Sequence, residues 1–128
     1  MIVNIKGRVF SGRTTAAARL VTPGTKTLVV TQDGDFIDRL VTVIGSLNLY
    51  AYSELTLLNT SQPNILDRMS GVLELVKQNE YFTIIIDCVD AVKQVDLSFL
   101  TQLINHVENN ETSKTTLVLV EHQRIQGI

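Results

Sequence analysis

The chain has 128 residues, of which 45% are hydrophobic and 19% charged, and its formal net charge is −2. This length and composition are typical of one folded domain over 1–128 and exclude a disordered chain. Because Lys and Arg form no run, a nucleic-acid partner has no support from the charge, and because no apolar run approaches the ~20 residues of a membrane span, we expect no membrane segment. The single cysteine, Cys88, excludes an internal disulfide and fits the cytoplasmic location that we expect.

Short β-branched or aliphatic runs alternate along the chain with stretches of helical periodicity. In chain order they predict a strand at 2–5, a helix at 14–20, a strand at 27–30, a helix at 35–47 and a strand at 55–58. A helix at 64–79, a strand at 82–87, a helix at 97–109 and a strand at 116–120 complete the series. Asp35 and Asp96 are the expected N-caps of two of these helices. Such alternation predicts an α/β fold with three layers, a parallel five-stranded sheet with helices on both faces.

Ligands of open parallel sheets bind beyond the carboxyl ends of the strands, and the first such loop carries a motif. "GRVFSGRT" at 7–14 fits the pattern GxxxxG[KR][ST] between a predicted strand and a predicted helix, as in a phosphate-binding loop. Glycines let the backbone wrap a phosphate, the helix N-terminus supplies positive potential and a Thr hydroxyl reaches Mg²⁺. The predicted nucleotide contacts are Gly7, Ser11, Gly12, Arg13, Thr14 and Thr15. The alternative is a glycine-containing turn that leads into an Ala-rich helix.

Arg13 stands where a phosphate-binding loop usually has lysine. A guanidinium is planar and longer than an ammonium group, so it keeps the attraction to phosphate but shifts the geometry. We therefore expect nucleotide binding to survive this replacement better than hydrolysis.

The fourth predicted strand, "FTIIID", ends in Asp87. In proteins with a phosphate-binding loop, an aspartate at this place supports Mg²⁺ through its water shell, and Thr14 is the second predicted contact of the metal. Asp87 could equally cap a buried strand. Hydrolysis also needs a group that orients the attacking water, and Cys88 stands where many ATPases have a glutamate.

Candidates for the catalytic group follow the second strand, where Gln32 and Asp33 precede a predicted helix. Asp33 in "QDGD" could also be a simple turn residue. At the end of the fifth strand, His122 or Gln123 is placed to sense a terminal phosphate, unless the chain merely enters solvent there.

Taken together, "GRVFSGRT", "LVVTQDGDFIDRLVTVIG", "IIIDCVDAV" and "TLVLVEHQR" resemble the RecA-like branch of P-loop ATPases. That group includes recombinases, hexameric replicative helicases and circadian-clock ATPases. The resemblance implies the strand order 3-2-4-5-1, with ATP and Mg²⁺ as ligands. It places Arg13 and Thr14 at phosphate and metal, Asp87 at the metal, Gln32 or Asp33 at the catalytic carboxylate and His122 or Gln123 at the sensor.

Several features depart from the pattern of that family. Arg13 replaces the lysine, Gln32 and Asp33 stand at the glutamate position, and the sequence ends soon after the fifth strand. These departures predict a minimal or degenerate member that binds nucleotide with weak or absent hydrolysis and would be an ATPase if active. It would work in a homo-oligomer or with a larger ATPase partner. The alternatives are a non-catalytic scaffold or regulatory module with an empty loop and, less favoured, a small phosphotransferase.

Overall fold

The computed structural model describes residues 1–7, 16–17, 19–22, 24–31, 34–46, 54–60, 62–87, 89–109 and 114–122. Its centre is one sheet of five parallel strands: β1 (Ile2–Gly7), β2 (Lys26–Thr31), β3 (Glu54–Asn59), β4 (Thr83–Asp87) and β5 (Thr116–His122). The strands lie in the order β1-β5-β4-β2-β3. Read from the β3 edge this order is 3-2-4-5-1.

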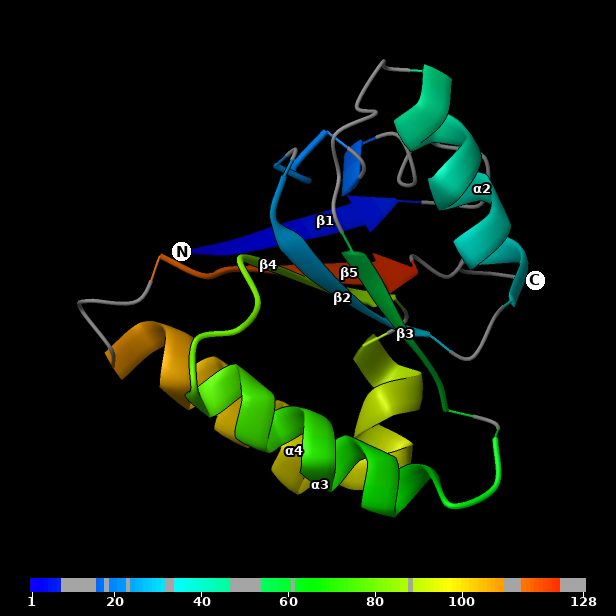
Figure 1. Cartoon of the computed structure of the whole chain (residues 1–128). Helices are drawn as coiled ribbons and strands as arrows, with labels where there is room; N and C mark the ends of the chain where they lie inside the picture. The colour runs from blue at the N-terminus through cyan, green and yellow to red at the C-terminus, as the bar shows by residue number, and fades with distance from the viewer. Residues whose placement is uncertain are drawn as a thin grey trace.

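The helices cover both faces of this sheet, as the alternation of strands and helices predicts (Figure 1). Helix α2 (Gly34–Ser46) lies on one face, and helices α3 (Ile65–Lys77) and α4 (Val89–Asn109) lie together on the other. Residues 16 and 17 are also helical, and Ala17 packs in the same core cluster as the α2 side chains.

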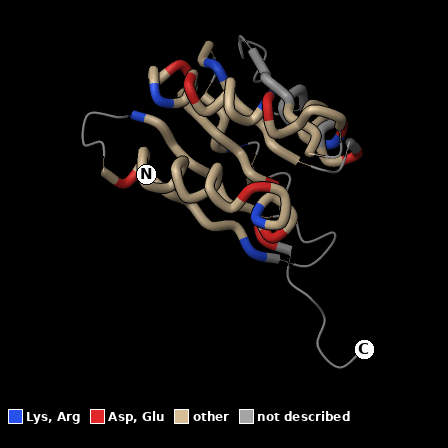
Figure 2. Tube along the Cα trace, turned by 90° about the horizontal axis from the view of Figure 1, so that it is seen from below, with Lys and Arg blue, Asp and Glu red and all other residues tan. Residues whose placement is uncertain are grey.

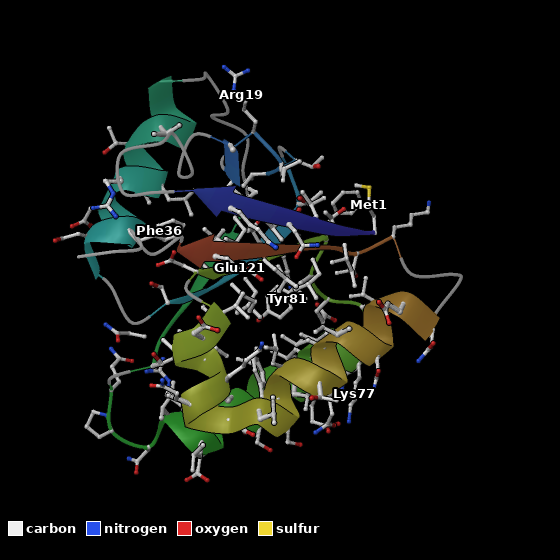
Figure 3. The ribbon with its side chains drawn as sticks, turned by 180° about the vertical axis from the view of Figure 1, so that it is seen from behind. Met1, Arg19, Phe36, Lys77, Tyr81 and Glu121 are labelled. Carbon is white, nitrogen blue, oxygen red and sulfur yellow. The ribbon has the colours of Figure 1, made fainter. Side chains whose placement is uncertain are left out.

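The two sides of the core follow from the alternation of side chains along each strand. Even-numbered residues of β2 and β4, such as Leu28 and Ile86, pack against α3 and α4. Odd-numbered ones, such as Val29 and Ile85, pack against Ala17 and α2. Figure 3 shows the same division, with Phe36 of α2 and Tyr81 on opposite sides of the sheet.

The central strands are rich in β-branched residues because both of their faces are covered. All five residues of β4 are buried, and β2 is buried from Thr27 onward. Strand β1, in contrast, forms an edge of the sheet, and its Asn4 and Lys6 are exposed.

Both helix starts for which an aspartate N-cap was expected differ from the structure. Helix α4 begins at Val89, eight residues before the expected start at 97, although Asp96 still acts as a cap inside it. Asp96 has non-helical backbone angles (φ −158°, ψ 93°), and its Oδ1 accepts a hydrogen bond from the Phe99 N–H at 3.2 Å. Helix α2 begins at Gly34, so Asp35 lies in its first turn and is not its N-cap. There the Asp35 carboxylate lies near the positive end of the helix dipole.

Candidate functional site

The carboxyl ends of the strands form one edge of the sheet, and the pairing register sets which residues lie side by side there. Thr31 pairs with Asn59 across β2 and β3, and Asp87 pairs with Val120 across β4 and β5. Val30 pairs with Ile86, so the next residues, Thr31 and Asp87, are neighbours on β2 and β4. Because side chains in one row of a parallel sheet point to the same face, Asn59, Thr31 and Asp87 share a face. It is the α2 face, since Val29 and Ile85 lie two residues earlier on the same strands.

Asp87 ends the central strand β4 and is 2% exposed. The Thr31 hydroxyl, itself fully buried, donates a hydrogen bond to Asp87 Oδ2 at 2.8 Å. Bonds of a hydroxyl to a carboxylate are about twice as strong as bonds between neutral groups. The carboxylate is therefore held in place by a hydrogen bond from a neighbouring strand.

The chemistry of this edge fits Mg²⁺, which binds through one or two carboxylates together with phosphate oxygens and keeps several waters. Asp87 is one carboxylate at this edge, and Thr14, the second predicted metal contact, lies outside the described residues. Within the described part of the chain, no three His, Cys, Asp or Glu side chains gather closely enough to hold a metal ion. A metal at Asp87 would accordingly need further ligands from a bound phosphate or from residues outside the described part of the chain.

Both flanks of the candidate phosphate loop are described. The loop follows Gly7, the last residue of β1, which pairs with His122 of β5. The chain is described again at Ala16 and Ala17, which are helical, and Ala17 is fully buried on the α2 face. That is the face on which Asp87 and Thr31 lie. The candidate loop thus connects the carboxyl edge of the sheet with the layer that covers the Asp87 side.

Asp87 and the start of the candidate phosphate loop at Gly7 lie on strands that are not neighbours in the sheet. Strand β5 lies between β1 and β4, so Gly7 and Asp87 are about 10 Å apart in the direction across the strands. Asp87 is level with Ile5, because both pair with Val120, and Gly7 lies two residues further along β1.

Most of the predicted contacts lie outside the described residues: Ser11, Gly12, Arg13, Thr14, Thr15, Gln32, Asp33 and Gln123, together with Cys88. His122 ends β5 beside Gly7, and its side chain lies outside the described part of the chain, so its role as the sensor stays a prediction. Asp87 is the predicted site residue whose side chain is described.

Sequence reasoning missed Thr31. The chain has threonines at several strand ends, and nothing local distinguishes this one. Its contact joins residues 56 positions apart, and it depends on the pairing of β2 with β4. The signal that could have found it is the combination of strand order and strand length, which sets Thr31 level with Asp87.

A cavity of about 500 Å³ lies at the opposite, amino-terminal edge of the sheet. It is lined by residues 25–26, 79–82 and 114–115, and Lys26 Nζ contacts Glu80 Oε2 there at 3.1 Å. Its position beyond the amino ends of β2, β4 and β5 separates it from the candidate site.

Charges in the described part of the chain are mixed. Figure 2 shows Lys and Arg interspersed with Asp and Glu along the helices. Of the helices that the structure describes, none is both long and apolar enough to cross a membrane.

In comparisons with known proteins, no family model and no curated protein matches this sequence.

Proposed function

We propose that the chain binds ATP with Mg²⁺ at the carboxyl edge of the sheet, with weak or absent hydrolysis. The observation that carries the proposal is the buried carboxylate of Asp87 at the end of a central parallel strand. It lies on the face to which the candidate phosphate loop returns at Ala17. Ligands of open α/β sheets bind beyond this edge.

In this proposal each group of the loop has its own role in binding the nucleotide. Backbone N–H groups between Gly7 and Thr14 bind phosphate oxygens, and Arg13 adds a positive charge. Thr14 and Asp87 face the Mg²⁺ ion, which neutralises charge on the phosphate oxygens when it is bound. Weak hydrolysis is proposed because Gln32 and Asp33 replace the glutamate of the family that the sequence resembles. By the same resemblance, the chain would act in a homo-oligomer or as a subunit of a larger ATPase.

One observation favours the alternative, a scaffold or regulatory module with an empty loop. The hydrogen bond from Thr31 gives Asp87 a structural partner without any ligand. A protein in which Asp87 only joins two strands would have the same contact.

Titration with ATP and MgCl₂ separates the two proposals. Binding is followed by calorimetry, and thermal unfolding is measured in parallel, because a ligand at 100 times its dissociation constant stabilises a protein by about 2.7 kcal/mol. We expect saturable binding and a rise in Tm. If millimolar Mg²⁺ and ATP change neither signal, nucleotide binding is refuted and the scaffold remains.

Two arginines of the same segment allow the location of ATP binding to be tested. Arg13 belongs to the motif, whereas Arg19 lies outside it, is exposed and points away from the sheet in Figure 3. We expect Arg13→Ala to weaken ATP binding on the order of tenfold or more, since a bond to a charged group contributes about 1.5–3 kcal/mol. Arg19→Ala removes the same charge and should leave the affinity nearly unchanged. Equal losses in the two variants would show a general charge effect instead of a phosphate loop.

The substitution Asp87→Asn tests whether the Asp87 carboxylate faces a Mg²⁺ ion. The amide keeps the shape of the side chain but removes its charge, so the dependence of ATP binding on Mg²⁺ should be lost. An unchanged dependence would contradict the assignment of Asp87 to the metal.

A further inference from the structure

The end of β2 supplies a rigid donor to Asp87. Thr31 is the last residue of β2, and its backbone carbonyl oxygen accepts a hydrogen bond from the Thr60 N–H at 2.9 Å. Its side chain is β-branched and fully buried, so few rotamers are open to it. The Thr31 hydroxyl is therefore restricted in position by its burial and by the backbone bond at the end of β2 before any ligand binds.

The hydroxyl acts on one oxygen of the carboxylate and thereby on the orientation of the whole group. The 2.8 Å bond to Asp87 Oδ2 restricts rotation about the bond that carries the carboxylate. Carboxylates that serve metals are commonly held by such hydrogen bonds, and loss of the supporting partner costs about 10–100-fold in metal affinity or activity. Sites that are supported by strands hold their geometry better than sites on loops.

From these observations we infer that Thr31 is a positioning residue, which orients Asp87 for the Mg²⁺ ion of a bound nucleotide. The inference rests on the proposed function and adds to it a residue that the sequence motifs do not contain. Thr31 also directly precedes Gln32 and Asp33 in the chain.

Strand β2 offers a matched control in Thr27. Thr27 lies four residues before Thr31, points to the same face and is also fully buried. Its Oγ1 has no hydrogen-bond partner within the described part of the chain. Thr27→Val and Thr31→Val therefore make the same chemical change in the same strand, and only the second removes a bond to Asp87.

The experiment compares the magnesium effect, which is the ratio of the ATP dissociation constant in EDTA to that in saturating MgCl₂. We measure it by calorimetry for the wild type, Thr31→Val, Thr31→Ser and Thr27→Val. We expect Thr31→Val to lower the ratio about tenfold or more. Thr31→Ser retains the hydroxyl and should keep the ratio within about twofold of the wild type, as should Thr27→Val.

Circular dichroism first establishes that each variant is folded at the assay temperature. If Thr31→Val is not folded, Thr31→Ala takes its place, because it also lacks the hydroxyl and adds no methyl group. A purely structural role for Thr31 predicts a lower Tm with an unchanged magnesium effect, and that result overturns the inference. A loss in Thr31→Ser as large as in Thr31→Val overturns it too, because the hydroxyl would then not be the cause.

Failure of the proposed function gives a different result. If the wild type does not bind ATP at all, nucleotide binding is refuted and the role of Thr31 falls with it. If the wild type binds ATP but shows no magnesium effect, the metal assignment and the inference are refuted, while nucleotide binding stands. If the wild type shows the effect and Thr31→Val shows it equally, the inference alone is wrong.

Discussion

Two threonines of β2 should respond to the same substitution with opposite changes in stability. Thr27 and Thr31 are both fully buried, on the same face of one strand. Thr31 donates to the carboxylate of Asp87, and such bonds to charged groups contribute about 1.5–3 kcal/mol. Thr31→Val should therefore lower the free energy of unfolding by about 2 kcal/mol. The Thr27 hydroxyl has no partner among the described residues, so Thr27→Val removes an unsatisfied buried group and should raise that free energy by about 1 kcal/mol.

The assay is urea unfolding followed by circular dichroism, without nucleotide or metal, so that ligand binding does not enter the comparison. For a domain of this size, 1 kcal/mol corresponds to a change in Tm of about 4 °C, so thermal melts should separate the variants as well. Unchanged m-values would show that the substitutions act on stability and not on the extent of unfolding. If Thr31→Val is as stable as Thr27→Val, the bond to Asp87 contributes nothing to the fold, and the reasoning from its length and burial is refuted.

Two further predictions concern the helices. Met69 and Leu66 lie one turn apart on α3, where Met69 is fully buried and Leu66 is 56% exposed. In urea unfolding, Met69→Ala should lower the free energy of unfolding by about 2–5 kcal/mol, and Leu66→Ala should lower it by less than about 0.5 kcal/mol. Similar losses in the two variants would contradict the packing of α3. Asp96 caps the second segment of α4, because its carboxylate accepts a hydrogen bond from the Phe99 N–H. In the same assay, Asp96→Ala should lower the free energy of unfolding by about 1 kcal/mol, and Asp96→Ser should retain most of that stability. If both variants lose the same stability, the side chain does not act as a cap.

The fold could be predicted to the extent that it depends on local pattern. Strands β2 and β4 are nearly continuous in apolar residues because both of their faces are covered, and α3 shows buried positions at helical spacing, Met69, Val72, Leu73 and Val76. The start of α4 escaped prediction for a physical reason. Its first segment carries β-branched valines at 89, 92 and 95, which are weak helix formers, and the clear capping signal at Asp96 lies inside the helix. Packing of Val89 and Val92 against the sheet overrides that weak propensity.

The site could be predicted only where one residue carries the signal by itself. Asp87 ends a buried strand in a parallel sheet, and the sequence shows both facts. Thr31 also ends a buried strand, but its importance depends on the pairing of β2 with β4 and on the length of both strands. Thr27, of the same type and equally buried on the same strand, has a different environment. A motif search examines residues along the chain, and so it could not distinguish between these two threonines.

The charge of Asp87 sets this edge of the sheet apart from the rest of the described core. Asp87 is the only buried carboxylate among the described residues, whereas the other buried polar side chains there are threonines. Burial of an ionised group costs several kcal/mol, and the hydrogen bond from Thr31 is one contact that offsets part of that cost. An asparagine would accept the same bond from Thr31 without the charge. Asp87→Asn therefore separates the charge from the hydrogen bond: if the charge serves the proposed cation, the variant should lose the effect of Mg²⁺ on ATP binding while it keeps the link between β2 and β4.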